Sequence, residues 1–446
     1  MQQFVIEGGH PLNGEITVGG NKNAALKMLP ACLLTEEPVI LHNMPDIGDV
    51  RVLAEIMRGL GVVIDWIAPR TMRVHARNVT STQIDARLAQ KLRASIVLAG
   101  PMLARCGEVY LPVPGGDAIG ERRLDQHISA LRRLGAEIRY DGGAFTMKAA
   151  ELRGADILLF EASVTATENA IMAAVLAKGT TTLKNAASEP HVQDLCLMLN
   201  QLGAQIEGIG SNRLIITGVE KLHGGEGRVG ADFMEVGSYI GAAAMTGGSI
   251  LLRKADPQHL EMIGLAYERL GVRFEIQGED VYVPAHQSLS IVPDLGNRIP
   301  ILKAQPWPAF PPDLMSIALV MATQCAGSIL FHDWMYESRF FFTDKLSRMG
   351  ARITLCDPHR VLVQGPTALK GVPYISSPDI RAGMALLLAA LAARGETRIS
   401  NIQQIDKGYE NVEQKLNALG ANIVRVNVGE MPTEPIEPTR PGWASA

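Results

Sequence analysis

Residues 133–138 read RLGAEI, and the chain repeats this pattern five more times. The other copies are GLGVVI at 59–64, QLGAQI at 201–206, RLGVRF at 269–274, RMGARI at 348–353 and ALGANI at 418–423. Successive copies lie 68 to 79 residues apart. Each copy closes an amphipathic stretch, where a glycine is the usual left-handed end of a helix. The alternating residues that follow each glycine predict a strand.

A second element recurs upstream of each copy, a stretch of mostly small apolar residues. The six stretches are NAALKMLPACLL (23–34), RASIVLAGPMLA (93–104), NAIMAAVLAKG (169–179), YIGAAAMTGG (239–248), IALVMATQCAG (317–327) and GMALLLAALAARG (383–395). Helices that are apolar on all sides are normally buried. A strand often follows, as in TTTLKNA (180–186). The sequence therefore predicts an α/β protein of six repeated units, each with a buried helix.

The length of the unit bears on domain organisation. Units of about 70 residues are longer than solenoid repeats, which are typically ~20–50 residues. Two globular domains of three units each fit the usual size of domains better. We predict one domain at 22–231 and a second at 1–21 plus 232–428, so that the chain crosses between them twice. The proline-rich residues 429–446 predict a disordered tail.

Composition excludes several classes of protein. The 446 residues include 42 basic and 46 acidic ones, which argues against nucleic acid as the main partner. The five cysteines form no CxxC pair, so we expect reduced thiols rather than a metal or redox site. We expect no secretory signal, since the first residues have neither a basic nor an apolar segment, and the longest apolar run, 382–393, is too short for a bilayer. We expect a cytoplasmic protein with no membrane contact and no obligate protein partner.

The stretch LPVPGGDAIGERR at 111–123 places the carboxylate of Asp117 directly after two glycines, with a pair of arginines at 122–123. On its own, PGGD is typical of a surface turn. Seven further stretches stand with it in a fixed order. All eight are GGNKNAALKMLP (19–30), RASIVLAGPMLA (93–104), PGGDAIGERRLDQHI (114–128), SVTATENAIMAA (163–174), PAFPPDLMSIA (308–318), ESRFFFTDKLSRMGA (337–351), PDIRAGMALL (378–387) and QIDKGYENVEQKLNALGA (404–421).

In these stretches the chain resembles the enolpyruvyl transferases, and within them the branch with a UDP-sugar acceptor. The resemblance covers Phe4 to Val426. It implies two inside-out domains of three units, with the helices inside. It also implies transfer of the enolpyruvyl group of phosphoenolpyruvate to the 3′-hydroxyl of UDP-N-acetylglucosamine with release of phosphate, the first committed step of peptidoglycan precursor synthesis. Neither a metal nor an organic cofactor is implied.

Such a reaction needs cations fixed around two anionic substrates. Lys22 stands at a predicted helix start, where backbone N–H groups also favour anions. The resemblance makes Lys22 a catalytic, phosphate-binding cation and Asn23 a ligand of the intermediate, whereas the residues alone also fit a solvated helix cap. Arg93 precedes an apolar helix. It is either a substrate ligand or one half of an ion pair at the helix end.

Arg339 and Arg381 are predicted to begin their helices, where the helix dipole disfavours a cation and a compensating anion is expected. The resemblance assigns both to the carboxylate side of the substrate, with Asp379 fixing the site. It assigns Arg122, near the mobile loop, to the phosphate, and Lys407 to the phosphate and carboxylate of phosphoenolpyruvate. Lys407 replaces a family arginine, which keeps the charge and loses bidentate geometry.

Two aspartates are the candidate proton-transfer groups. Asp313 follows two prolines at the start of a buried helix, where it fits a plain N-cap. The resemblance assigns it to the sugar 3′-hydroxyl as the proton acceptor, and one carboxylate has lone pairs for both roles. Asp117 stands where most family members carry cysteine on a loop that closes over the site. As the catalytic acid it needs a raised pKa. We also expect insensitivity to fosfomycin, the epoxide that targets that cysteine.

The resemblance also suggests residues for the uridine and sugar. They are Asp125, His127, Ser163, Val164 and Tyr336. A histidine in a helix is often structural, so His127 has both interpretations open. Glu161 stands near the diphosphate, where an acid is unfavourable unless its side chain turns outward. Glu161, Lys407 and the missing cysteine leave a catalytically silent UDP-sugar binder as one alternative, and an enolpyruvyl transferase acting on shikimate 3-phosphate is the other.

Overall fold

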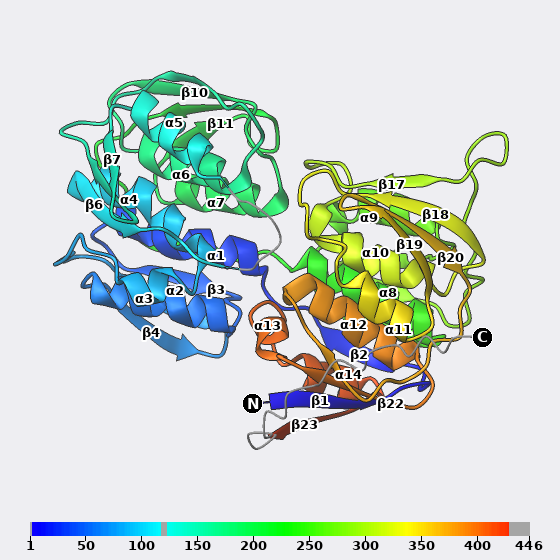
Figure 1. The fold of residues 1–446 in the computed structure, drawn as a ribbon. Coiled ribbons are helices and arrows are strands. Elements are labelled where there is room, and N and C mark those ends of the chain that lie inside the picture. Colours follow the sequence, from blue (N-terminus) through cyan, green and yellow to red (C-terminus); the bar gives the residue numbers. More distant parts are fainter. Residues whose placement is uncertain (1, 117–122, 428–446) are drawn as a thin grey trace, which may run out of the picture.

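Six small β-sheets lie on the outside of the described part of the chain, residues 2–116 and 123–427 of a computed structural model. Each sheet contains one of the strands that follow a repeated glycine, namely β4, β7, β11, β15, β19 and β23. The six sheets therefore correspond to the six repeats. Figure 1 shows them in two lobes, three to a lobe.

The sheets of the first lobe, each in spatial order, are β13 (Gly225–Arg228), β3 (Val39–His42), β5 (Thr71–His75) and β4 (Val63–Ala68); β6 (Glu108–Pro112), β8 (Ala144–Lys148) and β7 (Glu137–Asp141); and β11 (Gln205–Glu207), β12 (Arg213–Thr217), β10 (Thr180–Lys184) and β9 (Asp156–Leu158). Those of the second lobe are β15 (Glu275–Gln277), β16 (Asp280–Val283), β14 (Ser249–Arg253) and β2 (Asn13–Thr17); β17 (Ile301–Lys303), β18 (Gly327–His332), β20 (Arg360–Gly365) and β19 (Arg352–Asp357); and β21 (Ile375–Ser376), β22 (Glu396–Ser400), β1 (Gln2–Glu7) and β23 (Asn422–Asn427). Five of the sheets in this part of the chain are mixed, with one parallel pair at an edge, such as β14 with β2.

The helices fall into the two predicted kinds. The buried ones are α1 (Lys22–Ala31), α4 (Ala99–Cys106), α6 (Val164–Ala174), α8 (Phe233–Thr246), α10 (Met315–Ala322) and α12 (Ile380–Ala392). Those that precede a repeated glycine are α2 (Gly48–Gly59), α5 (Asp125–Arg133), α7 (Pro190–Gln201), α9 (Glu261–Glu268), α11 (Thr343–Arg348) and α14 (Val412–Ala418). Short elements complete the set: α3 (Ala86–Ala89), α13 (Gln403–Asp406), and the 3₁₀ helices η1 (Cys32–Leu34), η2 (Arg93–Leu98), η3 (Pro257–His259) and η4 (Pro312–Leu314).

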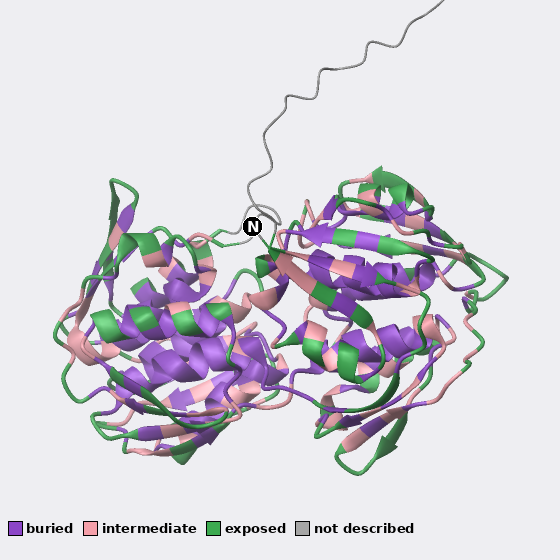
Figure 2. Cartoon of the chain, turned by 90° about the horizontal axis from the view of Figure 1, so that it is seen from below, coloured by how far each residue is buried: buried purple, intermediate pink, exposed green. Residues whose placement is uncertain are grey.

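The buried helices form the centre of each lobe. Figure 2 shows buried residues concentrated in these helices and exposed residues on the strands around them. Within the second lobe, α8, α10 and α12 pack against one another, and their small side chains permit that close approach. The apolar run at 382–393 lies within this core. The predicted fold class, with helices inside and sheets outside, is confirmed. Within the described residues, no helix combines the length and the apolar character needed to span a bilayer.

The repeated glycines end their helices as predicted. All six have positive φ, between +76° and +103°, a region in which glycine has no steric penalty. One predicted strand begins late. After Gly271, strand β15 starts at Glu275 rather than directly after the glycine. The reason is that the side-chain amide of Gln287 accepts from the N–H of Arg273 at 2.6 Å and donates to its carbonyl at 2.9 Å, so a side chain takes the place of a neighbouring strand.

Two crossing segments join the lobes. Gly20 and Ala231 form an antiparallel bridge, with Asn21 N–H donating to the Gly230 carbonyl at 2.8 Å. Strands β1 and β2 belong to sheets of the second lobe, and the two hydrophobic cores separate in the same way. We keep the predicted domains, 22–231 and 1–21 plus 232–428, as a proposal that these contacts support. Residues 428–446, including the predicted tail, lie outside the described residues.

The crossing predicts a strict requirement for glycine at position 20. A Cβ added to Gly20 would lie 1.8 Å from the carbonyl oxygen of Asn43, which belongs to the backbone and cannot rotate aside as a flexible side chain can. We expect Gly20→Ala to lower the free energy of unfolding by about 2 kcal/mol or more. The matched control is Gly59→Ala, since nothing lies within 4 Å of a Cβ there. Thermal unfolding of both variants is the measurement, and equal melting temperatures would contradict the packing described.

Candidate active site

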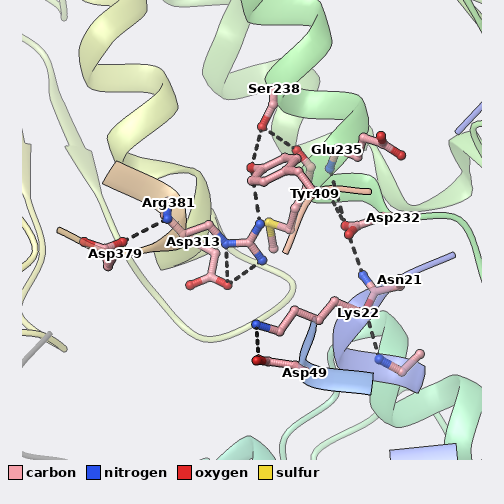
Figure 3. Close-up of polar contacts among 12 residues, drawn as sticks. Asn21, Lys22, Asp49, Asp232, Glu235, Ser238, Asp313, Asp379, Arg381 and Tyr409 are labelled. Atoms are coloured by element: carbon pink, nitrogen blue, oxygen red, sulfur yellow. Dashed lines mark hydrogen bonds and ion pairs between the residues drawn. The ribbon is translucent and has the colours of Figure 1, made fainter. Parts of the chain in front are cut away.

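Three buried helices begin at a cavity between the lobes. Asn21 caps α1, Asp232 caps α8 and Asp379 caps α12, each by accepting backbone N–H groups of the first turn. Asn21 also donates to Asp232 Oδ1 at 3.3 Å, which ties the starts of α1 and α8 together across the crossing (Figure 3). Polar residues at apolar helix ends are thus brought to one place by the fold. The cavity has a volume of about 230 Å³.

Asp313 lies between two arginines in this cavity. Arg339 Nη2 donates to Asp313 Oδ1 at 3.2 Å, and Arg381 donates to Oδ2 through Nε at 3.2 Å, with its Nη2 3.1 Å away. Both arginines are almost fully buried. Burial alone would raise the pKa of Asp313, but the charges of Arg381 and Arg339 outweigh burial and hold that pKa well below its usual range. Among the described residues, the hydrogen bonds to this carboxylate come from the two arginines and not from a helix N-terminus.

Further side chains hold the two arginines in position. Asp379 Oδ1 accepts from the N–H of Arg381 at 2.8 Å, and Arg381 Nη1 donates to the hydroxyl of Tyr409 at 3.3 Å (Figure 3). Asp333, which is fully buried, lies 3.7 Å from Arg339 Nε. Arg339 also stacks over the ring of Tyr336 at 4.9 Å. Cations fixed in this way are preorganised to stabilise negative charge.

Lys22 reaches the same region from the first lobe. Its Nζ lies 2.7 Å from Asp49 Oδ2, and both side chains are largely buried. A neighbouring cavity of about 140 Å³ is lined by Lys22, Arg93 and Lys407, and it extends to Gly116, the last described residue before 117–122. Basic side chains from separate parts of the chain, these three together with Lys27 and Lys91, therefore surround one small space that Asp49 also lines. That arrangement suits a phosphate group.

The structure brings most of the predicted site residues to these two adjoining cavities. They are Lys22, Asn23, Arg93, Val164, Asp313, Tyr336, Arg339, Asp379, Arg381 and Lys407. Asp117 and Arg122 lie outside the described residues. Asp125 is exposed and lines a different surface cavity, and Ser163 stands at the start of α6 next to Val164. Glu161 is exposed, as an acid near a diphosphate would need to be.

His127 does not reach the cavities. It is buried, its Nδ1 accepts from the side-chain amide of Asn169 at 3.0 Å, and its Nε2 lies 3.0 Å from Thr165 Oγ1. The Asn169 amide is oriented by its other bonds, since Oδ1 accepts from Gly100 N–H and Nδ2 also donates to the Ile96 carbonyl. Both ring nitrogens of His127 are therefore used within the protein. The geometry supports its structural role and not the predicted uridine contact.

This burial makes a prediction about pH. Burial lowers the pKa of His127 to about 3, and the charge of Arg93 acts in the same direction. The unfolded chain has the ordinary value near 6.5, so it binds the proton more readily and stability falls as pH drops below about 6.5. Between pH 7 and 5 the wild type should lose about 2 kcal/mol more unfolding free energy than His127→Gln. Urea unfolding at both pH values measures this difference, and identical losses would contradict the assignment.

The start of Arg339's helix was predicted wrongly. Arg339 lies in a turn, and α11 begins four residues later at Thr343. The turn buries Phe340 and Phe342 while directing the arginine inward to Asp313.

Several buried polar residues escaped the sequence analysis. Lys27 Nζ in α1 lies 3.4 Å from Glu168 Oε2 in α6, and both side chains are almost completely buried. Burial raises the pKa of Glu168 to about 8, although Lys27 opposes that shift. The available signal was a charged residue inside each of two helices whose other residues, past the first turn, are uncharged. Glu189 and His191, at the start of α7, also line the larger cavity.

Comparison with known proteins agrees with this geometry. The family model of EPSP synthase (3-phosphoshikimate 1-carboxyvinyltransferase) matches residues 6–416. A UDP-N-acetylglucosamine 1-carboxyvinyltransferase of Bradyrhizobium diazoefficiens is 53% identical over 95% of this chain and 98% of its own length. That of Borreliella burgdorferi is 52% identical over 96% of this chain and 99% of its own.

Solved structures show the same fold at lower identity. An enolpyruvyl transferase of Streptomyces tendae has a TM-score of 0.85 at 24% identity, covering 96% of this chain and 99% of its own. EPSP synthase of Acinetobacter baumannii has a TM-score of 0.73 at 18% identity, covering 96% and 100%. The chain therefore belongs to the enolpyruvyl transferase family, in the branch of the UDP-N-acetylglucosamine 1-carboxyvinyltransferases.

Proposed function

We propose that this protein transfers the enolpyruvyl group of phosphoenolpyruvate to the 3′-hydroxyl of UDP-N-acetylglucosamine and releases phosphate. This is the first committed step of peptidoglycan precursor synthesis. Because both substrates are metabolites of the cytoplasm, we place the reaction there. The observation that carries the proposal is Asp313 held between Arg339 and Arg381 in a cavity that Lys22 also lines, in a chain about half identical to enzymes of that name.

The reaction balances with the residues present. The sugar oxygen forms a bond to C2 of phosphoenolpyruvate while its proton passes to Asp313, and Asp117 protonates the methylene carbon C3. The product of this addition is a tetrahedral ketal that bears both a carboxylate and a phosphate. Asp117 then takes a proton back from C3 while the bond between C2 and the phosphate oxygen breaks, which restores the vinyl group. The proton held by Asp313 passes to the departing phosphate. Lys22, Arg93 and Lys407 serve the phosphate, and Arg339 and Arg381 serve the carboxylate.

The low pKa of Asp313 is compatible with a base. An anionic substrate that binds Arg339 and Arg381 competes with Asp313 for their N–H groups. The charges of Arg339 and Arg381, which hold the pKa of Asp313 down, are then shared between Asp313 and the substrate. The pKa of Asp313 therefore rises when the sugar hydroxyl lies beside it. In active sites the pKa of a catalytic base is commonly set by the charged groups around it.

Phosphate release from phosphoenolpyruvate tests the proposal. Purified protein is assayed with UDP-N-acetylglucosamine and, separately, with shikimate 3-phosphate. We expect release with the UDP-sugar only. Release with shikimate 3-phosphate would identify the other branch of the family. Binding of the UDP-sugar without release would instead establish the silent binder.

A further inference from the structure

One end of the larger cavity has a chemistry different from the cationic end around Asp313. Glu189 and His191 lie at the start of α7 in the first lobe, and both line the cavity. His191 is 4% exposed, and its Nδ1 has no hydrogen-bond partner among the described residues. The same holds for Oε2 of Glu189. These two buried, unsatisfied polar atoms call for a ligand group that can pair with them.

The second lobe supplies an apolar wall at this end. Trp307 and Phe233 line the cavity with their ring centroids 5.7 Å apart. Ser188, next to Glu189, donates to the carbonyl of Trp307 at 3.4 Å, so the two lobes touch beside the cavity. The result is a slot with polar groups on one lobe and aromatic rings on the other, which we call the amide slot: Glu189, His191, Phe233 and Trp307.

The charges around the amide slot favour a neutral ligand group. The carboxyl of Glu189 disfavours an anion, and Lys27, which also lines the cavity, disfavours a cation. Burial lowers the pKa of His191 well below its usual value, so the ring is neutral and offers one donor and one acceptor. A small group with an N–H donor, a carbonyl acceptor and a methyl fits this set. In such a group the N–H would donate to Glu189, the carbonyl would accept from the His191 ring, and the methyl would pack on the aromatic rings.

We propose that the amide slot binds the 2-acetamido group of the acceptor sugar, making Glu189 and His191 specificity residues. This inference rests on the proposed function. The acetamido group stands on the carbon next to the reacting 3′-hydroxyl, so its pocket has to adjoin the proton acceptor. His191 meets that condition, because it and Asp313 line one cavity of about 230 Å³. Recognition there also fixes the orientation of the sugar ring relative to Asp313.

The test compares UDP-N-acetylglucosamine with UDP-glucose, which carries a hydroxyl in place of the acetamido group. The variants are Glu189→Gln and His191→Phe, with His191→Gln as a second variant if the first does not fold. The matched controls are the exposed residues of the same lobe, Glu207→Gln and His223→Phe. Steady-state phosphate release gives kcat/KM for each acceptor and KM for phosphoenolpyruvate.

We expect each slot variant to reduce the preference for UDP-N-acetylglucosamine by about tenfold or more, the value of one hydrogen bond, while the controls keep it. KM for phosphoenolpyruvate should stay within about twofold of wild type. A twofold change corresponds to less than the ~0.5 kcal/mol that is typical of neutral substitutions. Equal losses with both acceptors, or an unchanged preference, would overturn the inference.

A different outcome separates the inference from the proposed function. If wild type releases no phosphate with either acceptor, the proposed function fails, and calorimetric binding of the two UDP-sugars then tests the slot. Tighter binding of UDP-N-acetylglucosamine that is lost in the slot variants supports it. Equal binding of the two sugars, or binding of neither, overturns it.

Discussion

Replacing Asp313 with asparagine is expected to lower kcat for phosphate release by about 10³-fold, within the range for loss of a general acid or base. Asparagine keeps the shape of the side chain and one acceptor oxygen for Arg339, but it cannot take the proton of the 3′-hydroxyl. The effect should fall on kcat. KM for phosphoenolpyruvate should not rise, because Arg339 and Arg381 are then freer to bind its carboxylate.

The matched control is Asp344→Asn, an exposed aspartate on α11 in the same lobe. It should retain wild-type kcat. An Asp313→Asn variant that keeps a tenth or more of the activity, with its fold intact by circular dichroism, would refute the role of Asp313 as base.

The same site sets an expectation for pH. Because the arginines hold the pKa of Asp313 well below its usual range, its carboxylate is ionised throughout the range in which the protein is assayed. The acidic limb of kcat/KM, which reports the groups of the free enzyme, should therefore belong to another residue. That limb should persist in the residual activity of Asp313→Asn. Its disappearance in that variant would contradict the ion-pair geometry.

The second large effect concerns Asp117. We expect wild type to retain full activity after incubation with fosfomycin, because a carboxylate is not alkylated as a thiolate is. Asp117→Cys should become sensitive, with time-dependent loss of nearly all activity and a covalent adduct on that residue. Intact-mass spectrometry with the activity assay measures both. Potent inhibition of wild type, together with an adduct on it, would contradict the prediction.

The Asp117→Asn variant tests proton donation by Asp117 separately from binding of the UDP-sugar. Asparagine has no proton to give to the methylene carbon, so phosphate release should be lost while UDP-sugar binding remains.

Exposed Cys356 is the internal control for the alkylation experiment with fosfomycin, since wild type carries this cysteine too. An adduct on Cys356 without loss of activity leaves the prediction standing.

Local patterns predicted the repeated architecture well. The glycines at the helix ends and the largely apolar helices depend on sequence preferences that act within a few residues. The six units could therefore be predicted from the sequence alone. Lys22 at the start of α1 and Arg381 at the start of α12 followed from the same local logic. These predictions required no knowledge of how the lobes meet.

What the sequence could not give was the pairing across long separations. Asp313 was predicted as a helix cap or a base, yet its partners Arg339 and Arg381 are 26 and 68 residues away. Asp49 beside Lys22 and Tyr409 beside Arg381 have no local signature either. His127 illustrates the opposite case, because only the position of Asn169 reveals that its ring is fully occupied by protein groups. Long-range packing decided each of these contacts.

Identification of the product by mass spectrometry and NMR is the direct test of enolpyruvyl transfer to the 3′-hydroxyl. Phosphoenolpyruvate labelled with ¹³C at C2 and UDP-N-acetylglucosamine are incubated with the protein until phosphate release is complete. We expect one UDP-sugar product with the labelled carbon joined through an ether to the 3′-oxygen, formed in equal amount to phosphate. Unmodified UDP-sugar after prolonged incubation, or label attached at any other position, would contradict it.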